Sequence, residues 1–120
     1  MEMNVHYASG HQFTDYSDTS VTMNGKSYAS NIVVTNTEVT TFAVARVDEL
    51  QPSDLNSILT ELPDLIIFGV AGKITYPKAP ILQMLQARGV GFEVMPIQAL
   101  CRTFNFLISE NRKIAAILFF

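Results

Sequence analysis

The sequence contains a single cysteine, Cys101, so no disulfide can form within the chain. Its first residues, MEMNVHYASGHQF, show neither a basic segment followed by an apolar one nor an Arg-rich amphipathic pattern, so we expect no signal or transit peptide. The longest apolar run, IAAILFF at residues 114–120, has seven residues, whereas a membrane-spanning helix needs about 20. We therefore expect a cytoplasmic protein without a transmembrane segment, and a buried strand over residues 114–120.

Basic residues are also few. The chain has eight Lys and Arg against eleven Asp and Glu, which gives a net charge of −3, and the basic residues are spread through the sequence. Nucleic-acid binding needs a concentrated basic face that neutralises phosphates. The composition therefore argues against nucleic acid as a main partner, and for the same reason against an anionic membrane surface.

The length of 120 residues and the apolar fraction of 48% suit one hydrophobic core. A second core would not fit, and no internal repeat or low-complexity linker interrupts the chain. We expect a single domain over residues 1–120.

The first third of the chain has the pattern of β-strands. Asn24-Gly25 lies between β-forming residues and is typical of a type I′ hairpin turn. Pairing across this turn sets Val21 opposite Tyr28. The residues that then share the predicted core face are Val21, Met23, Tyr28, Ile32 and Val34. A further strand is predicted over residues 39–47, where both faces carry apolar residues and burial on both sides is expected.

Helix and strand patterns alternate from Leu50 onward. Pro52-Ser53-Asp54 is a helix start signal, and it precedes a helical stripe of Leu55, Ile58, Leu59 and Leu62. The elements predicted after it are a strand at 65–69, a helix at 79–88 stopped by Gly89, a strand at 90–94, a helix from about Pro96 and the terminal strand. The strand-helix-strand order from Leu65 onward indicates a right-handed crossover that joins parallel strands, at least for the strands near 65–68 and 90–94. We predict an α/β fold of three layers, in which helices flank a mixed, mostly parallel central sheet and an N-terminal β-hairpin forms a further layer.

Cys101 lies in the apolar stripe of the helix that begins near Pro96. The stripe consists of Ile97, Leu100, Cys101, Phe104, Leu107 and Ile108. A thiol in such a stripe should be buried and unreactive. Arg102 is rotated by about 100° from it on the helix, and both histidines, His6 and His11, lie far away in the N-terminal region, so no base is placed to activate the sulfur. We expect no catalytic residue here.

The same helix carries a polar stripe of Gln98, Arg102, Asn105 and Ser109. One interpretation is a solvated helix face. The other is that Arg102 and Asn105 edge a crevice beside the parallel strands.

The segment Gly69-Val70-Ala71-Gly72-Lys73 follows the first parallel strand, and ligands of open α/β sheets bind at the carboxyl ends of strands. Its backbone amides and Lys73 could cradle an anion. It does not match the phosphate-binding GxxxxGK[ST] pattern, because two residues separate the glycines and Ile74 follows the lysine. A turn required by geometry is the competing interpretation.

Metal and cofactor signals are lacking. His6 and His11 with Asp15 and Asp18 have neither the spacing nor the secondary structure of a metal site, so we expect no metal and no cofactor.

The run GVGFEVMPIQALCRTFNFLISENRKIAAIL, residues 89–118, is similar to the signature of a small family of unknown function in bacteria and archaea. The mitochondrial relative of that family is complex I (NADH dehydrogenase) assembly factor 3. The most specific part is CRTFN at residues 101–105, and GHQF, MNGKSYASNIVV and LIIFGVAGKITYP also resemble family segments. Two positions depart from the pattern. Val70-Ala71 replaces the threonine of the family's G-T-G loop, and Leu100 replaces an alanine.

The resemblance implies a three-layer α/β fold without an established enzymatic activity. It favours a non-enzymatic interaction or assembly factor with a respiratory or membrane-protein partner. The alternative is a small-ligand or anion-binding domain at the carboxyl ends of the parallel strands. An enzyme based on Cys101 ranks below both, and the sequence leaves the oligomeric state open, including a homo-oligomer. The candidate ligand-binding residues are Gly69, Val70, Ala71, Gly72, Lys73, Arg102 and Asn105.

Overall fold

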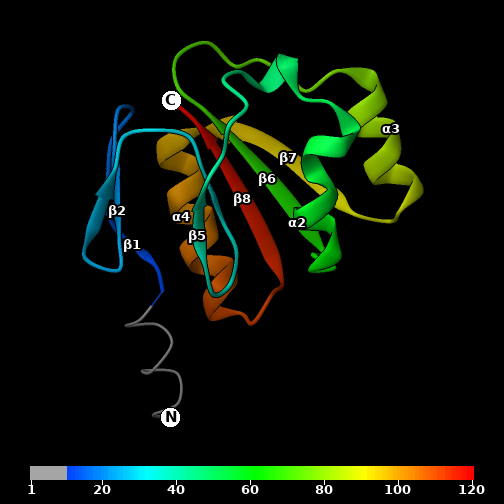
Figure 1. Ribbon diagram of the computed structural model, residues 1–120. Coiled ribbons are helices and arrows are strands. Elements are labelled where there is room, and N and C mark those ends of the chain that lie inside the picture. The colour runs from blue at the N-terminus through cyan, green and yellow to red at the C-terminus, as the bar shows by residue number, and fades with distance from the viewer. Residues whose placement is uncertain (1–10) are drawn as a thin grey trace.

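The computed structural model describes residues 11–120, which form an α/β fold in three layers (Figure 1). A five-stranded sheet is the middle layer. Short helices cover one face of it, and the longest helix together with a three-stranded sheet covers the other. This confirms the predicted fold class.

The N-terminal sheet is antiparallel. It contains β1 (Phe13–Tyr16), β2 (Val21–Met23) and β3 (Lys26–Tyr28), in that order. Asn24 and Gly25 join β2 to β3 with φ of 57° and 77°, the two positive values that a type I′ turn requires. Val21 pairs with Tyr28, so the predicted hairpin register is confirmed.

The central sheet has the strand order β5-β4-β8-β6-β7. Its strands are β4 (Ile32–Val34), β5 (Val39–Thr41), β6 (Leu65–Val70), β7 (Gly91–Pro96) and β8 (Ile114–Phe119). β4 is antiparallel to both of its neighbours, whereas β8, β6 and β7 are parallel. β5 therefore runs in the same direction as those three, and the sheet is mixed and mostly parallel, as predicted.

The two crossover helices are α3 (Ala79–Ala87) and α4 (Ile97–Ser109). α3 follows β6 and leads to β7, while α4 follows β7 and returns to β8 on the other side of β6. Because both crossovers favour the right-handed form, the two helices must lie on opposite faces of the sheet. Their buried residues accordingly belong to separate clusters, with Ile81 of α3 in one and Leu100 of α4 in the other.

Short helical segments connect β5 to β6. They are the 3₁₀ helices η1 (Val47–Glu49) and η2 (Pro52–Leu55), followed by α2 (Asn56–Thr60). The predicted start signal is confirmed, because the Asp54 carboxylate accepts a hydrogen bond of 2.8 Å from the backbone N–H of Gln51 and caps η2.

The strand predicted over residues 39–47 is wrong beyond its first part, β5. Ala43 and Ala45 are exposed, so the segment is not buried on both sides. β5 lies at the edge of the sheet, and the chain then leaves it. The side chain of Asn31 donates to the carbonyls of Val44 and Ala45 at 2.9 and 3.0 Å, so these backbone groups bind a side chain rather than another strand.

β8 lies at the centre of the sheet and all of its residues are buried. The buried strand predicted over residues 114–120 is thus confirmed except at Phe120, which follows β8 and is partly exposed. Two asparagines that flank β4 form hydrogen bonds with the backbone at the two ends of β8. Asn36 Oδ1 accepts a hydrogen bond of 2.9 Å from Ile114 N–H, and its Nδ2 donates to the Arg112 carbonyl at 2.8 Å. Asn31 Oδ1 accepts a hydrogen bond of 2.7 Å from Phe120 N–H. The ladder between β4 and β8 is thus continued at both ends by side-chain amides.

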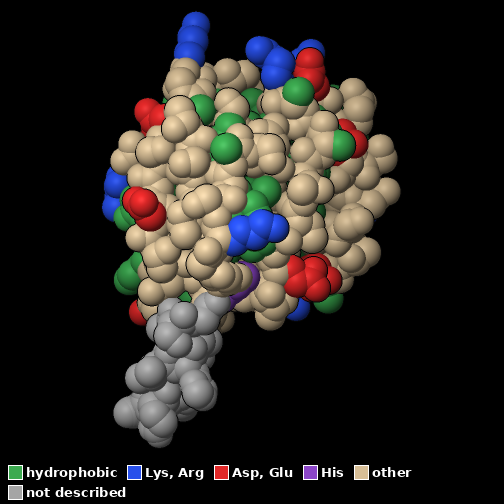
Figure 2. All heavy atoms as spheres, turned by 60° about the vertical axis from the view of Figure 1, so that its left-hand side comes forward, with side chains coloured by type: hydrophobic (Ala, Val, Ile, Leu, Met, Phe, Trp, Pro, Cys, Tyr) green, Lys and Arg blue, Asp and Glu red, His purple; other side chains and the backbone are tan. Residues whose placement is uncertain are grey.

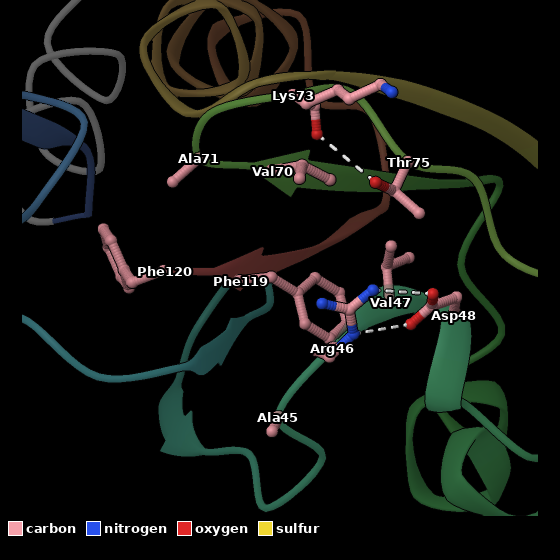
Figure 3. Close-up of a pocket in the computed structure, with 10 residues that line it drawn as sticks. All are labelled: Ala45, Arg46, Val47, Asp48, Val70, Ala71, Lys73, Thr75, Phe119 and Phe120. Carbon is pink, nitrogen blue, oxygen red and sulfur yellow. Dashed lines mark hydrogen bonds and ion pairs between the residues drawn. The ribbon is translucent and has the colours of Figure 1, made fainter.

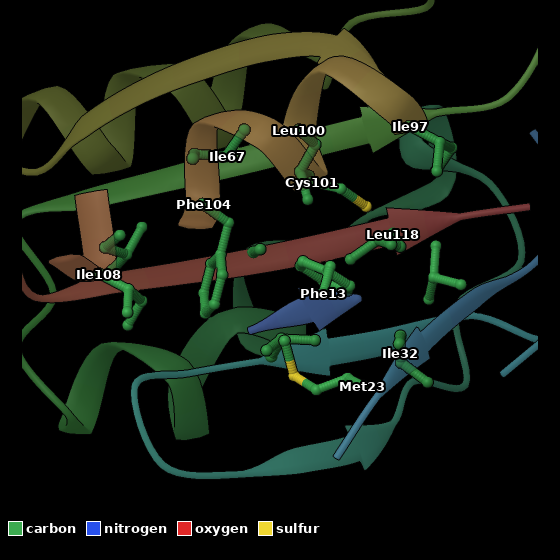
Figure 4. Packing of buried hydrophobic residues seen from close by; sticks show 14 residues of the cluster. Phe13, Met23, Ile32, Ile67, Ile97, Leu100, Cys101, Phe104, Ile108 and Leu118 are labelled. Carbon is green, nitrogen blue, oxygen red and sulfur yellow. The ribbon is translucent and has the colours of Figure 1, made fainter. Parts of the chain in front are cut away.

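α4 packs against the central sheet and the N-terminal sheet at the same time (Figure 4). Its buried residues are Ile97, Leu100, Cys101, Phe104 and Ile108, which confirms the predicted apolar stripe at these positions. Phe104 contacts Phe13 of β1 edge to face, with ring centroids 5.3 Å apart. Gly69 of β6 permits the approach of the helix, because a Cβ at that position would lie 2.7 Å from Leu100 Cδ1.

The outer surface on the side of the N-terminal sheet carries charges of both signs in scattered positions, and hydrophobic side chains reach it in small, separate areas (Figure 2). Within residues 11–120, no helix has the length and apolar character to cross a membrane.

Leu62 departs from the prediction that it belongs to the buried stripe of the first helix. Leu55, Ile58 and Leu59 are buried, but Leu62 is 76% exposed. α2 ends at Thr60, and Leu62 follows with a φ of 55°. A left-handed residue is common at this position after a helix, and it is usually glycine. A leucine there bears a conformational cost without burying its side chain.

Replacing Leu62 with asparagine should therefore raise the free energy of unfolding by about 1 kcal/mol, since the left-handed region costs ordinary residues roughly 1–2 kcal/mol and asparagine tolerates it. Urea denaturation followed by circular dichroism measures the change. Leu62→Ala is the control, because it removes the same side chain but keeps the strained backbone. An asparagine variant no more stable than the alanine variant would contradict this account.

Candidate functional site

A hollow of about 360 Å³ lies at the carboxyl ends of the parallel strands β6 and β8 (Figure 3). The segment after β6 forms one side of it and the segment around η1 forms the other. The volume is within the range of roughly 300–1,000 Å³ typical of small-molecule sites. This is the end of the sheet at which ligands of open α/β folds bind.

Apolar side chains form a small part of the accessible lining, which is otherwise more polar. Val47, Val70 and Phe119 line the hollow and are almost fully buried. The Phe119 ring is held edge to face against Phe42, with centroids 5.9 Å apart. These side chains leave only a small apolar area accessible to a ligand.

Arg46 and Asp48 form a paired charge at one side of the hollow. Arg46 donates from Nε to Asp48 Oδ1 at 3.0 Å and from Nη2 to Oδ2 at 2.8 Å. The hydrogen bonding from Arg46 lowers the pKa of Asp48, and the same contact raises the pKa of Arg46. The pair is therefore ionised at neutral pH, and its two hydrogen bonds orient the exposed guanidinium toward Asp48.

Lys73 lies on the opposite side. Its backbone carbonyl accepts a hydrogen bond of 3.3 Å from Thr75 Oγ1, which closes the turn after β6. Its side chain is exposed, and within residues 11–120 its ammonium has no carboxylate partner. Among the side chains that line the hollow, Arg46 and Lys73 are cationic and Asp48 is anionic.

The segment predicted to bind a ligand contributes three residues to this hollow, Val70, Ala71 and Lys73. Gly69 points toward α4 instead, where it makes room for Leu100. Gly72 has a φ of 72°, so its place in the turn favours glycine. The backbone N–H of Ala71 donates to the Phe119 carbonyl at 3.0 Å, so this amide already has a partner.

The other two predicted residues, Arg102 and Asn105, lie on α4 and do not line the hollow. Asn105 holds β1 in place: its Oδ1 accepts from Phe13 N–H and its Nδ2 donates to the Phe13 carbonyl, both at 2.8 Å. Gln98 donates to Asp18 Oδ1 at 3.3 Å. Much of the polar stripe is thus a seam between α4 and the N-terminal sheet, whereas Arg102 is exposed.

Sequence reasoning missed Arg46, Asp48 and Phe119 as members of the site. Arg46 lies in the segment predicted as strand, residues 39–47, Asp48 directly follows that segment, and Phe119 lies in the predicted buried terminal strand. The close charge pair Arg46-Val47-Asp48, directly after an apolar segment, was the available signal.

His11 is a structural residue in the described part of the chain. Its Nε2 lies 2.7 Å from the Thr35 carbonyl and its Nδ1 lies 3.3 Å from Asn24 Nδ2. A neutral ring that donates from Nε2 and accepts at Nδ1 satisfies both contacts. His6 lies outside the described residues. Across residues 11–120, no three His, Cys, Asp or Glu side chains are grouped to hold a metal ion.

Cys101 is fully buried, as its position in the stripe predicted. Burial raises the pKa of the thiol to about 12, and the nearby charge of Arg102 lowers it by less. At neutral pH the thiolate, which is the reactive form, is therefore scarce.

We expect Cys101 to resist iodoacetamide at pH 8 in the folded protein and to react readily in denaturing urea. The physical reason is that unfolding returns the thiol to water and to its ordinary pKa. Mass spectrometry after timed exposure measures the modified fraction. Arg102→Gln is the matched variant and should leave the folded protein equally unreactive. Rapid labelling of the folded wild-type protein would show an accessible thiolate instead.

Comparison with known proteins adds the family. The family model described as "Protein of unknown function (DUF498/DUF598)" matches residues 13–119. The 13 kDa major membrane protein of Francisella tularensis subsp. holarctica (strain LVS) is 26% identical over 109 residues, which cover 88% of each chain. NADH dehydrogenase (ubiquinone) 1 alpha subcomplex assembly factor 3 of Xenopus tropicalis is 32% identical over 69 residues, which cover 58% of this chain but 38% of the frog protein.

A solved structure supports the fold independently. A protein of Xanthomonas campestris, determined by NMR, aligns with a TM-score of 0.83 over 90% of this chain and 83% of its own length, at 24% identity. The family resemblance noted in residues 89–118 is thus confirmed. The chain belongs to the DUF498/DUF598 family of proteins of unknown function and is related to the assembly factors of NADH dehydrogenase.

Proposed function

We propose that this protein is a non-enzymatic assembly factor that binds a protein partner during the assembly of a respiratory complex. The observation that carries the proposal is the 32% identity over 69 residues with a protein named as an assembly factor of NADH dehydrogenase. This chain spans 38% of the length of that relative, so the activity of the whole relative enters as part of the proposal.

Leu62 is our candidate for the partner-binding position. Its left-handed backbone costs roughly 1–2 kcal/mol in the isolated protein, and its exposed side chain recovers little of that cost. Burying a leucine side chain against a partner contributes about 1.5–3 kcal/mol, enough to offset the strain. A strained and exposed leucine is thus suited to a complex better than to a free monomer.

The surroundings of Leu62 support this choice. Leu62 borders a hollow of about 530 Å³ that Leu59, Pro63 and Val90 also line. Asp64 and Arg88 line the same hollow and supply charges of opposite sign. A surface that combines apolar and charged residues in this way suits a protein partner.

The experiment is deletion of the gene in its native cells, followed by native-gel quantification of the assembled respiratory complexes. We expect the deletion to lower the amount of assembled complex and the wild-type gene to restore it. Leu62→Asn should fold at least as stably as wild type and yet fail to restore assembly, because it lacks the apolar anchor.

Phe106→Asn is the matched control, because Phe106 is also an exposed apolar residue, at 63%, but lies on α4 away from this hollow. It should restore assembly. Unchanged complexes in the deletion strain would overturn the assembly role. Restoration by Leu62→Asn would overturn the choice of surface alone.

A second candidate function is a small-ligand or anion-binding domain that uses the crevice at the carboxyl ends of the parallel strands. The specific observation in its favour is the hollow beside β6 and β8, which two cationic side chains, Arg46 and Lys73, line together. Within this candidate, the roles of Gly69 to Lys73, Arg102 and Asn105 in binding remain predictions.

A further inference from the structure

We propose that the hollow beside β6 and β8 binds a carboxylate carried on an apolar group, with Lys73 and Arg46 holding the carboxylate. This inference rests on the second candidate function, the ligand-binding domain, and is independent of the assembly role. Two kinds of ligand carry a carboxylate on an apolar group: a small aromatic or aliphatic acid, and the C-terminus of a peptide with an apolar last residue.

The available donors fit a carboxylate. A guanidinium has five N–H groups, and the Asp48 carboxylate accepts from Nε and from one hydrogen of Nη2, which leaves three for a ligand. The Lys73 ammonium offers three more. Lys73 and Arg46 lie on opposite sides of the hollow, and Lys73 has a flexible stem, whereas two hydrogen bonds to Asp48 orient Arg46.

Lys73 is the lining cation whose ammonium has no carboxylate partner among residues 11–120. Arg46 is already paired with Asp48 through two hydrogen bonds. Lys73 is therefore the better placed of the two cations to pair with the carboxylate of a ligand.

Apolar side chains in the lining fit the remainder of the ligand. Val47, Val70 and Phe119 line the hollow and are 3%, 8% and 4% exposed, so a compact aromatic or branched group could cover the small apolar area that they leave accessible. A plain inorganic anion would leave that area uncovered. Cationic and apolar side chains in one hollow therefore favour an acid that also carries an apolar group.

The site is also preorganised. Asn31 donates to the carbonyls of Val44 and Ala45 and accepts from Phe120 N–H, so one side chain holds both the segment that carries Arg46 and the end of β8. The Ala71–Phe119 hydrogen bond holds the segment after β6 against β8. A preformed site loses less entropy on binding.

The test is a titration of the ¹⁵N-labelled full chain with 3-phenylpropionate, followed by NMR. We expect saturable shifts confined to residues 45–48, 70–75 and 119–120. The uncharged isostere 3-phenylpropanamide should bind at least tenfold more weakly. Equal binding of acid and amide, or shifts centred elsewhere, would overturn the proposal.

Two variants identify the cation. Lys73→Met should weaken binding of 3-phenylpropionate at least tenfold, whereas Lys26→Met, which removes an exposed cation on β3 away from this hollow, should leave it unchanged. The reverse pattern would overturn the assignment to this hollow.

Two further arms define the ligand class. Acetyl-Gly-Gly-Phe with a free carboxylate, compared with its amide, reports on the peptide source; tighter binding than 3-phenylpropionate would favour a peptide C-terminus, and weaker binding a free acid. Inorganic phosphate that binds more tightly than either would overturn the carboxylate class. Failure of every arm would leave the gene-deletion experiment on the assembly role unaffected.

Discussion

The burial of β8 between β4 and β6 is the constraint on which the rest of the structure depends. β8 pairs with an antiparallel strand on one side and a parallel strand on the other, and every residue in it is buried. Its polar backbone groups must therefore find partners within the protein. The ladders satisfy the interior of the strand, and Asn36 and Asn31 satisfy the N–H groups of Ile114 and Phe120 at its two ends.

This arrangement also determines where a ligand could bind. β8 and β6 end side by side, and the chain beyond β6 turns away while β8 ends next to the segment that carries Arg46. Asn31 binds both the carbonyls before Arg46 and the N–H of Phe120. The same side chain therefore caps the end of β8 and positions one side of the hollow. On the face of the central sheet that α4 covers, polar side chains of that helix have structural partners. Asn105 and Gln98 bind Phe13 and Asp18 and so hold α4 against the N-terminal sheet.

Much of the fold could be predicted because it follows from local pattern and elementary chirality. Asn24-Gly25 determines a type I′ turn and hence the register of its hairpin. The strand-helix-strand order indicates a crossover between parallel strands, which is how β6 and β7 pair. Leu62 was misplaced because helical spacing continues in the sequence after the helix itself has ended. Residues 42–47 were misassigned because their backbone groups bind Asn31, a residue distant in sequence, and no local pattern reports such a contact.

The sequence by itself determined the fold class, the burial of Cys101 and membership of a family, because each depends on residue type and on spacing along the chain. The tertiary structure decided which polar residues are free for function. Arg102 and Asn105 lie three positions apart on α4, yet Asn105 is bound to Phe13 and Arg102 is exposed. Arg46 and Lys73 are far apart in the chain and line one hollow. Contacts of this kind depend on how the layers pack. Packing brings together residues that are far apart in the chain, and no local sequence pattern predicts which residues will meet.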